Sequence, residues 1–168
     1  MNKNIVLIGM PGAGKSTIGV LLAKTLKKTF IDTDLLIQQK ENDFLQNIIN
    51  KNGIKYFLSL EERIVVSLEA ENHVIATGGS VIYSDRASSH LKKGGILIYL
   101  KLPYEIIEKR IKNIKTRGIA MENGQSLSDL FMERKQLYEK YSDYALECYQ
   151  KDSEEIIEEI ISIYKKTY

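Results

Sequence analysis

The sequence has few of the residues that build covalently linked or metal-stabilised folds. It contains one cysteine, Cys148, and two histidines among 168 residues, no tryptophan and only two prolines. A single thiol excludes an internal disulfide, and so few sulfur and imidazole ligands argue against a dedicated zinc site. The fold therefore depends on a hydrophobic core, for which a chain of this length and a 43% hydrophobic fraction suffice.

The chain also lacks a strong charge and a long apolar run. Its formal net charge of +2 is too small to indicate a nucleic-acid partner. No segment reaches the roughly 18 apolar residues that cross a membrane. The apolar run at residues 5–8 is too short for a secretory signal and leads directly into a glycine-rich loop. We therefore expect a cytoplasmic protein with no nucleic-acid or membrane partner. The length of the chain fits one domain over residues 1–168, and we expect that domain to be a monomer.

Short apolar runs alternate with helical patterns along most of the chain. The runs that predict buried strands are residues 5–8, 30–31, 74–77, 96–100 and, more weakly, 144–149. Strands that are buried on both faces and separated by helices imply a mostly parallel sheet with right-handed crossovers. The sequence thus predicts a doubly wound α/β fold.

Two stretches interrupt this alternation. Residues 34–72 carry helical patterning without a good strand, which predicts a helical insertion. Residues 112–125 have no sustained apolar period and contain Gly118 and Gly124. That composition is typical of a mobile loop over a functional site.

The glycine-rich loop at residues 9–16, GMPGAGKS, matches the G-x-x-x-x-G-K-[ST] phosphate-binding pattern. Small residues let backbone N–H groups wrap a phosphate, Lys15 can reach the β- and γ-phosphates, and the Ser16 hydroxyl can bind Mg²⁺. A chance match is disfavoured because a strand precedes the loop and an amphipathic helix follows it. ATP and Mg²⁺ are the predicted cofactors. The predicted nucleotide-binding residues of the loop are Gly12, Ala13, Gly14, Lys15, Ser16 and Thr17.

Two acidic residues, Asp32 and Asp34, follow the second predicted strand. On an extended segment, side chains at i and i+2 point the same way, so both could face a nucleotide at the carboxyl ends of the strands. The alternative is that Asp34 merely caps a helix that begins at Leu35. Beside a phosphate loop we favour a catalytic interpretation, because phosphoryl transfer needs a Mg²⁺ environment and a proton acceptor.

From residue 5 to about residue 144 the sequence resembles the shikimate kinase family. The resemblance rests on five segments in order, which are residues 9–16, Asp32-Thr33-Asp34, Gly53 with Phe57 and Glu61, residues 75–79, and Glu133-Arg134 with Leu137-Tyr138. It implies a three-layer, five-stranded parallel sheet, a substrate-binding insertion and a lid, and an acceptor that is a small molecule with a hydroxyl group.

The resemblance also implies roles for individual residues. Asp32 would position the metal through water, and Asp34 would bind the reacting hydroxyl and act as its base. Arg117 would be the catalytic lid arginine, and Arg110 would lie near the adenine. The implied acceptor-binding residues are Asp34, Phe57, Gly78, Gly79 and Arg134, the last pairing with a carboxylate.

The acceptor half departs from the family pattern. Leu58 stands where the family has an arginine that grips the substrate carboxylate, and Glu61 is retained without that partner. Such a charge-assisted bond is worth roughly 1.5–3 kcal/mol, so its loss should weaken carboxylate binding. Lys55, one turn earlier, could substitute. Ser80 replaces the family's third glycine, and Gly118 replaces a proline, which predicts a looser lid.

Three functions stay open at this point. The first is ATP-dependent phosphorylation of shikimate, and the second is phosphorylation of another small hydroxy acid, polyol or hydroxy amino acid. The third is a nucleotide-binding regulatory module without turnover. Retention of Lys15, Asp34 and Arg117 together argues against the third, because a binding module needs no base.

Overall fold

The computed structural model describes residues 3–112 and 118–168 and has a central parallel sheet. The strand order is β2-β3-β1-β4-β5, and every neighbouring pair is parallel. The strands are β1 (Asn4–Ile8), β2 (Thr29–Asp32), β3 (His73–Ala76), β4 (Gly95–Lys101) and β5 (Tyr144–Glu147). The predicted doubly wound, five-stranded α/β fold is confirmed.

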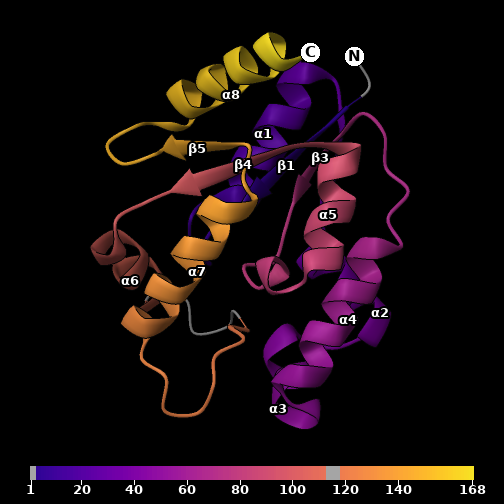
Figure 1. The fold of residues 1–168 in the computed structure, drawn as a ribbon, viewed down its shortest axis with the longest axis vertical. Helices are drawn as coiled ribbons and strands as arrows, with labels where there is room; N and C mark the ends of the chain where they lie inside the picture. Colours follow the sequence, from indigo (N-terminus) through magenta and orange to yellow (C-terminus); the bar gives the residue numbers. More distant parts are fainter. Residues whose placement is uncertain (1–2, 113–117) are drawn as a thin grey trace.

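Helices cover both faces of the sheet, giving three layers (Figure 1). Helices α1 (Lys15–Leu26) and α8 (Ser153–Thr167) pack against each other on one face, while α5 (Asp85–Gly94) and α7 (Leu127–Tyr141) contact β4 from the other. The central strand β1 is fully buried on both faces, as its run of four apolar residues requires. No helix in the described residues is long and apolar enough to cross a membrane.

Helix starts follow local capping chemistry. The Ser126 hydroxyl accepts the Asp129 N–H while the Asp129 carboxylate accepts the Ser126 N–H, which makes a capping box at the start of α7. Helix α8 begins at Ser153, and Asp152 is its N-cap, forming a second capping box with Glu155. Helix α6 (Tyr104–Lys112) follows β4 after Pro103.

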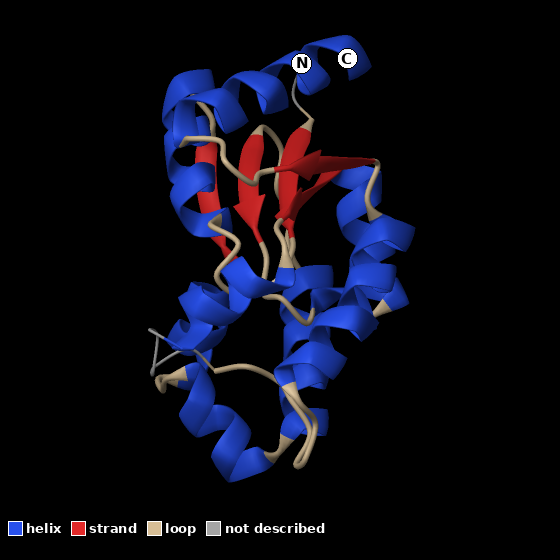
Figure 2. Cartoon of the chain, turned by 90° about the vertical axis from the view of Figure 1, so that its left-hand side faces the viewer, coloured by secondary structure: helices blue, strands red, loops and turns tan. Residues whose placement is uncertain are grey.

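The predicted helical insertion consists of α2 (Thr33–Glu41), α3 (Leu45–Asn52) and α4 (Ile54–Val66). It has its own small core, which includes Ile37, Ile48 and Leu60. Figure 2 shows that it lies beyond the ends to which the strand arrows point. A short 3₁₀ helix, η1 (Val81–Tyr83), follows β3 at the same end.

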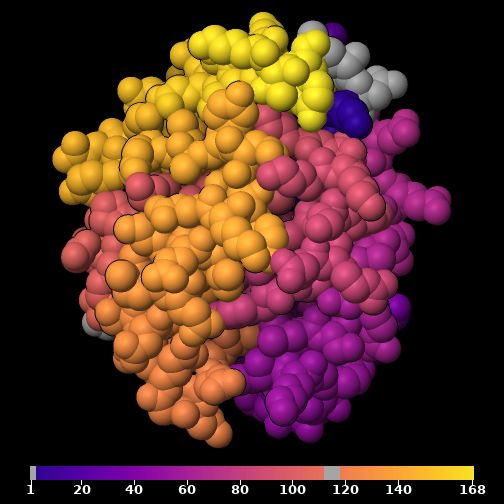
Figure 3. Space-filling view, viewed as in Figure 1, coloured from indigo at the N-terminus to yellow at the C-terminus, as the bar shows by residue number. Residues whose placement is uncertain are grey.

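The segment after residue 118 packs beside the insertion (Figure 3). A Cβ added to Gly118 would lie 2.6 Å from the Leu45 Cβ and 2.7 Å from the Gln46 N atom. This glycine therefore allows the segment to approach the start of α3 closely. That packing is a reason for a small residue at position 118, whereas the sequence had suggested only a looser lid.

Candidate active site

The phosphate loop joins β1 to α1 in a backbone shape that glycine permits. Gly12 and Gly14 have φ of +82° and +96°, a region that other residues rarely adopt. Gly14 is the N-cap of α1, so the N–H groups of the first turn face the loop. Lys15 is buried, and its Nζ donates to the carbonyl oxygens of Gly9 at 2.7 Å and Met10 at 2.9 Å. The result is a concave, positively polarised anion site.

Ser16 and Asp32 form the part of the site that suits a metal ion. The Ser16 hydroxyl donates to Asp32 Oδ2 at 2.6 Å, so a hydroxyl and a carboxylate share one position beside the phosphate loop. No cluster of three or more acidic, His or Cys ligands occurs in the described residues. Two hard oxygen donors next to a phosphate site fit Mg²⁺, which is usually held by few protein ligands together with phosphates and waters.

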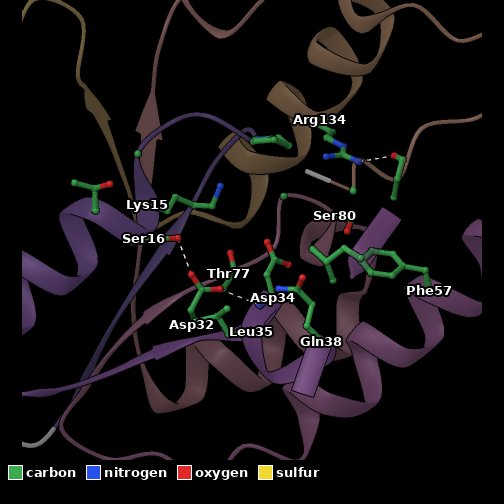
Figure 4. Close-up of a pocket in the computed structure, with 17 residues that line it drawn as sticks. Lys15, Ser16, Asp32, Asp34, Leu35, Gln38, Phe57, Thr77, Ser80 and Arg134 are labelled. Carbon is green, nitrogen blue, oxygen red and sulfur yellow. Dashed lines mark hydrogen bonds between the residues drawn. The ribbon is translucent and has the colours of Figure 1, made fainter. Parts of the chain in front are cut away.

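Asp34 reaches the site from a helix rather than from an extended segment. Helix α2 begins at Thr33, and Asp32 is its N-cap, accepting the Asp34 N–H at 3.0 Å. The prediction that the two aspartates point the same way along a strand is therefore wrong, and so is the alternative that Asp34 is the cap. Both nonetheless face one cavity of about 230 Å³, because a capping residue and the first helical turn lie side by side (Figure 4).

That cavity brings together the predicted phosphate and acceptor residues. Its described lining includes Lys15, Ser16, Thr17, Asp32, Asp34, Phe57, Gly79 and Arg134, from segments far apart in the sequence. Ser80 and Gln38 also line it, although the sequence assigned no role to Gln38. Gln38 lies one helical turn after Asp34, and that i+4 spacing is the signal that could have identified it.

Arg134 is held rigidly at the acceptor end. It is 1% exposed, its Nη2 donates to the Ala120 carbonyl at 2.6 Å, and its Nε donates to the Tyr83 hydroxyl at 3.3 Å. The guanidinium also lies over the Tyr83 ring at 5.3 Å. A buried, pre-oriented guanidinium suits recognition of a planar carboxylate.

Glycine is required at Gly78 because two carboxyl groups crowd it. An added Cβ would overlap Glu61 Oε1 and would lie 2.7 Å from Asp34 Oδ1. The Gly78 N–H donates to the Thr33 hydroxyl at 3.0 Å, so this group is used within the protein instead of pointing at an acceptor. Gly79 lines the cavity, and its carbonyl accepts the Tyr138 hydroxyl at 2.6 Å.

A second cavity, of about 350 Å³, lies on the other side of the phosphate loop. Arg110 lines it, and its Nη1 donates to the Gly12 carbonyl at 2.9 Å. Lys151 and Asp152, which precede α8, and Ser153, its first residue, also line this cavity. No sequence motif marks these residues, but ligands bind beyond the carboxyl ends of the strands in such sheets, and these residues follow the last strand.

The family model for shikimate kinase matches residues 11–165. The chain belongs to the shikimate kinase family. It is 37% identical over 166 residues to a shikimate kinase of Caldanaerobacter subterraneus, covering 98% of this chain and 97% of the relative. It is 39% identical to one of Clostridium botulinum with the same coverage. A solved shikimate kinase of Acinetobacter baumannii in complex with shikimate superposes with a TM-score of 0.89 at 30% identity, covering 99% of this chain and 95% of that one.

Of the positions that depart from the shikimate kinase family pattern, Ser80 and Gly118 line the main cavity. Leu58 does not line it but lines an adjoining cavity of about 240 Å³ with Glu61, Ser80 and Tyr83. Lys55 is exposed and is not among the residues that line the main cavity. Arg117, the predicted lid arginine, lies outside the described residues.

Proposed function

We propose that this chain transfers the γ-phosphoryl group of ATP to a hydroxyl group of shikimate. The observation that carries the proposal is the single cavity lined by Lys15, Asp34 and Arg134. It combines a phosphate-binding cation, a proton acceptor and a carboxylate-binding guanidinium, which are the groups that phosphorylation of a hydroxy acid needs. The likeness to a shikimate kinase solved with shikimate supports the choice of acceptor.

In the proposed reaction, the phosphate loop holds the β- and γ-phosphates, and Lys15 neutralises their charge. Arg134 binds the acceptor carboxylate and so orients its hydroxyl towards Asp34. Asp34 takes the hydroxyl proton while the acceptor oxygen bonds to the γ-phosphorus and the bond to ADP breaks. Arg110 and the cavity beside it would hold the nucleoside.

Ser16 and Asp32 would hold the Mg²⁺, Asp32 through water. When bound, the ion neutralises charge on the β- and γ-phosphates. The oxygen-only donor set, with its 2.6 Å contact between Ser16 and Asp32, is the observation that supports this assignment.

We further infer a cytoplasmic monomer. The supply of ATP favours the cytoplasm. One chain brings the phosphate loop, Asp34 and Arg134 to one cavity, which is compatible with a monomer.

A coupled ADP-release assay tests the proposal. Purified protein would be given ATP and Mg²⁺ with shikimate or with a panel of other hydroxy acids, polyols and hydroxy amino acids. Saturable turnover with shikimate at a KM below about 1 mM supports the proposal. Preference for another acceptor would establish the second function, and ADP binding without any turnover would establish a regulatory module.

Asp34→Asn separates catalysis from binding. The amide keeps the shape of the side chain but cannot accept the proton, so kcat should fall by about 10²–10⁴ while the Kd for ATP changes little. Calorimetric titration with a non-hydrolysable ATP analogue measures the second quantity. Turnover equal to that of the unaltered protein would refute Asp34 as the base.

A further inference from the structure

Glu61 is a buried carboxyl group without a full set of partners. Its side chain is 2% exposed on α4. The Ser80 hydroxyl donates to Oε2 at 2.6 Å, while Oε1 has no hydrogen-bond partner among the described residues. An ionised carboxylate in such a position would be strongly disfavoured, because burial removes its solvation and one hydroxyl does not replace it.

The unpartnered oxygen lies on the side of Asp34. Glu61 Oε1 and Asp34 Oδ1 both lie within 2.7 Å of one point, the place where a Cβ on Gly78 would stand. Two carboxyl groups this close favour a state in which one of them holds a proton. Asp34 lines the open cavity and Glu61 is the more deeply buried of the two, so the proton belongs on Glu61.

The other groups around Glu61 do not reverse this assignment. The charged side chains that act on it are Asp34 from α2, Arg134 from α7 and Lys15 from α1. Burial is the largest influence and raises the pKa of Glu61 to about 8, against the opposing effect of the Ser80 hydrogen bond. Tyr83 of η1 shares the adjoining cavity. On the α5 side, Arg86 pairs with Glu62 instead, and α3 contributes the apolar Ile48 and Ile49.

Leu58 explains why no cation from α4 itself pairs with this carboxyl. It stands three residues before Glu61 on α4, which places the two side chains on one face of the helix, and both line the same cavity. An apolar residue there leaves the hydroxyl of Ser80 as the group that fixes Glu61.

We propose that Ser80 and Glu61 form a positioning pair in which Glu61 is a neutral acid, held by the Ser80 hydroxyl and directing its own O–H towards Asp34. Ser80 thus holds the Glu61 side chain in place of the family's arginine. The apolar Leu58 leaves the Glu61 carboxyl uncharged. This inference rests on the proposed function for its effect on turnover, but the protonation of Glu61 can be measured without a substrate.

The direct test is a carbon-13 NMR titration of the glutamate carboxyl groups in the full chain. The Glu61 signal is assigned by its loss in Glu61→Gln, and its midpoint is expected near pH 8. Ser80→Ala should move that midpoint upwards, because the hydroxyl favours the ionised form. A Glu61 midpoint below pH 6 would overturn the proposal whatever the acceptor is.

The kinetic test uses pH profiles with shikimate. Glu61→Gln mimics the neutral acid, so it should lose far less kcat than Glu61→Ala and should lack the fall in kcat/KM above pH 8 expected of the unaltered protein. Equal losses in both variants, or an alkaline fall that persists in Glu61→Gln, would contradict a neutral donor. If the NMR midpoint lies near pH 8 but shikimate is not turned over, the proposed acceptor fails and the assignment of the proton stands.

Discussion

Glu61→Gln should change how the stability of the protein depends on pH. Burial raises the pKa of the Glu61 carboxyl from 4.5 to about 8 in the folded chain. Between these pH values the unfolded chain has released the proton while the folded chain retains it, so folding takes up a proton. The stability contributed by this group is complete below pH 4.5 and is lost progressively as the pH rises towards 8.

The size of the pH effect on the free energy of unfolding follows from the uptake of one proton per molecule on folding. Each pH unit within this window lowers the free energy of unfolding by up to about 1.4 kcal/mol. From pH 5 to pH 7 the loss is about 2.5 kcal/mol, which corresponds to about 5–10 °C in Tm for a chain of this length. Glutamine can still accept the Ser80 hydrogen bond but cannot ionise. The stability of Glu61→Gln relative to the unaltered protein should therefore rise by about 2.5 kcal/mol over this range.

Urea unfolding at pH 5, 6 and 7 measures this difference. The control is Glu62→Gln, which removes a carboxylate from the next position of α4, where Glu62 accepts the Ser84 hydroxyl and pairs with Arg86 at the surface. A stability difference for Glu61→Gln that stays constant from pH 5 to pH 7 would refute the reasoning. A slope of the same size in the Glu62 variant would show that burial of Glu61 is not its cause.

Three further outcomes are expected. Leu58→Arg should lower the KM for shikimate by about 10- to 100-fold, because it restores the charge-assisted contact that the family pattern implies for the substrate carboxylate; an unchanged KM would contradict this. Ser16→Ala should raise the Mg²⁺ concentration for half-maximal rate by about tenfold, measured by Mg²⁺ titration at fixed ATP, and an unaltered titration would remove Ser16 from the metal site. Gly118→Ala should raise the KM for the acceptor, because its Cβ would press on Leu45; normal kinetics would indicate that the segment has other ways to pack.

The sequence predicted the sheet and the phosphate loop because both depend on local pattern. The apolar run of β1 and the glycines of the following loop identify themselves within a dozen residues. The capping box at Ser126 and Asp129 is equally local, because it depends on residues three positions apart. The start of α2 was not, because an Asp-x-Asp sequence is compatible with an extended segment and with a helix cap. Only the hydrogen bond from the Asp34 N–H to Asp32 distinguishes them.

Contacts between distant segments were beyond the reach of sequence pattern. In the sequence, Ser80 was an isolated departure and Glu61 was a retained residue without its partner. Their hydrogen bond becomes visible only when α4 packs beside η1. The hydrogen bonds from Arg134 to Tyr83 and Ala120 likewise join segments that are distant in the sequence. Residue types therefore indicated the chemistry of the site, whereas the partners that fix each group required the tertiary structure.

The charge of the acceptor pocket ties these departures together. An arginine at position 58 and an ionised Glu61 would contribute one positive and one negative charge. Leu58 removes the first, and a neutral Glu61 removes the second, so the positive potential that Lys15 and Arg134 supply is not opposed by an additional buried anion. The pocket then still favours an anionic acceptor, although it offers one fewer bidentate partner. This balance predicts selectivity for carboxylic acids over uncharged polyols, with an affinity for the acid that is reduced but not abolished.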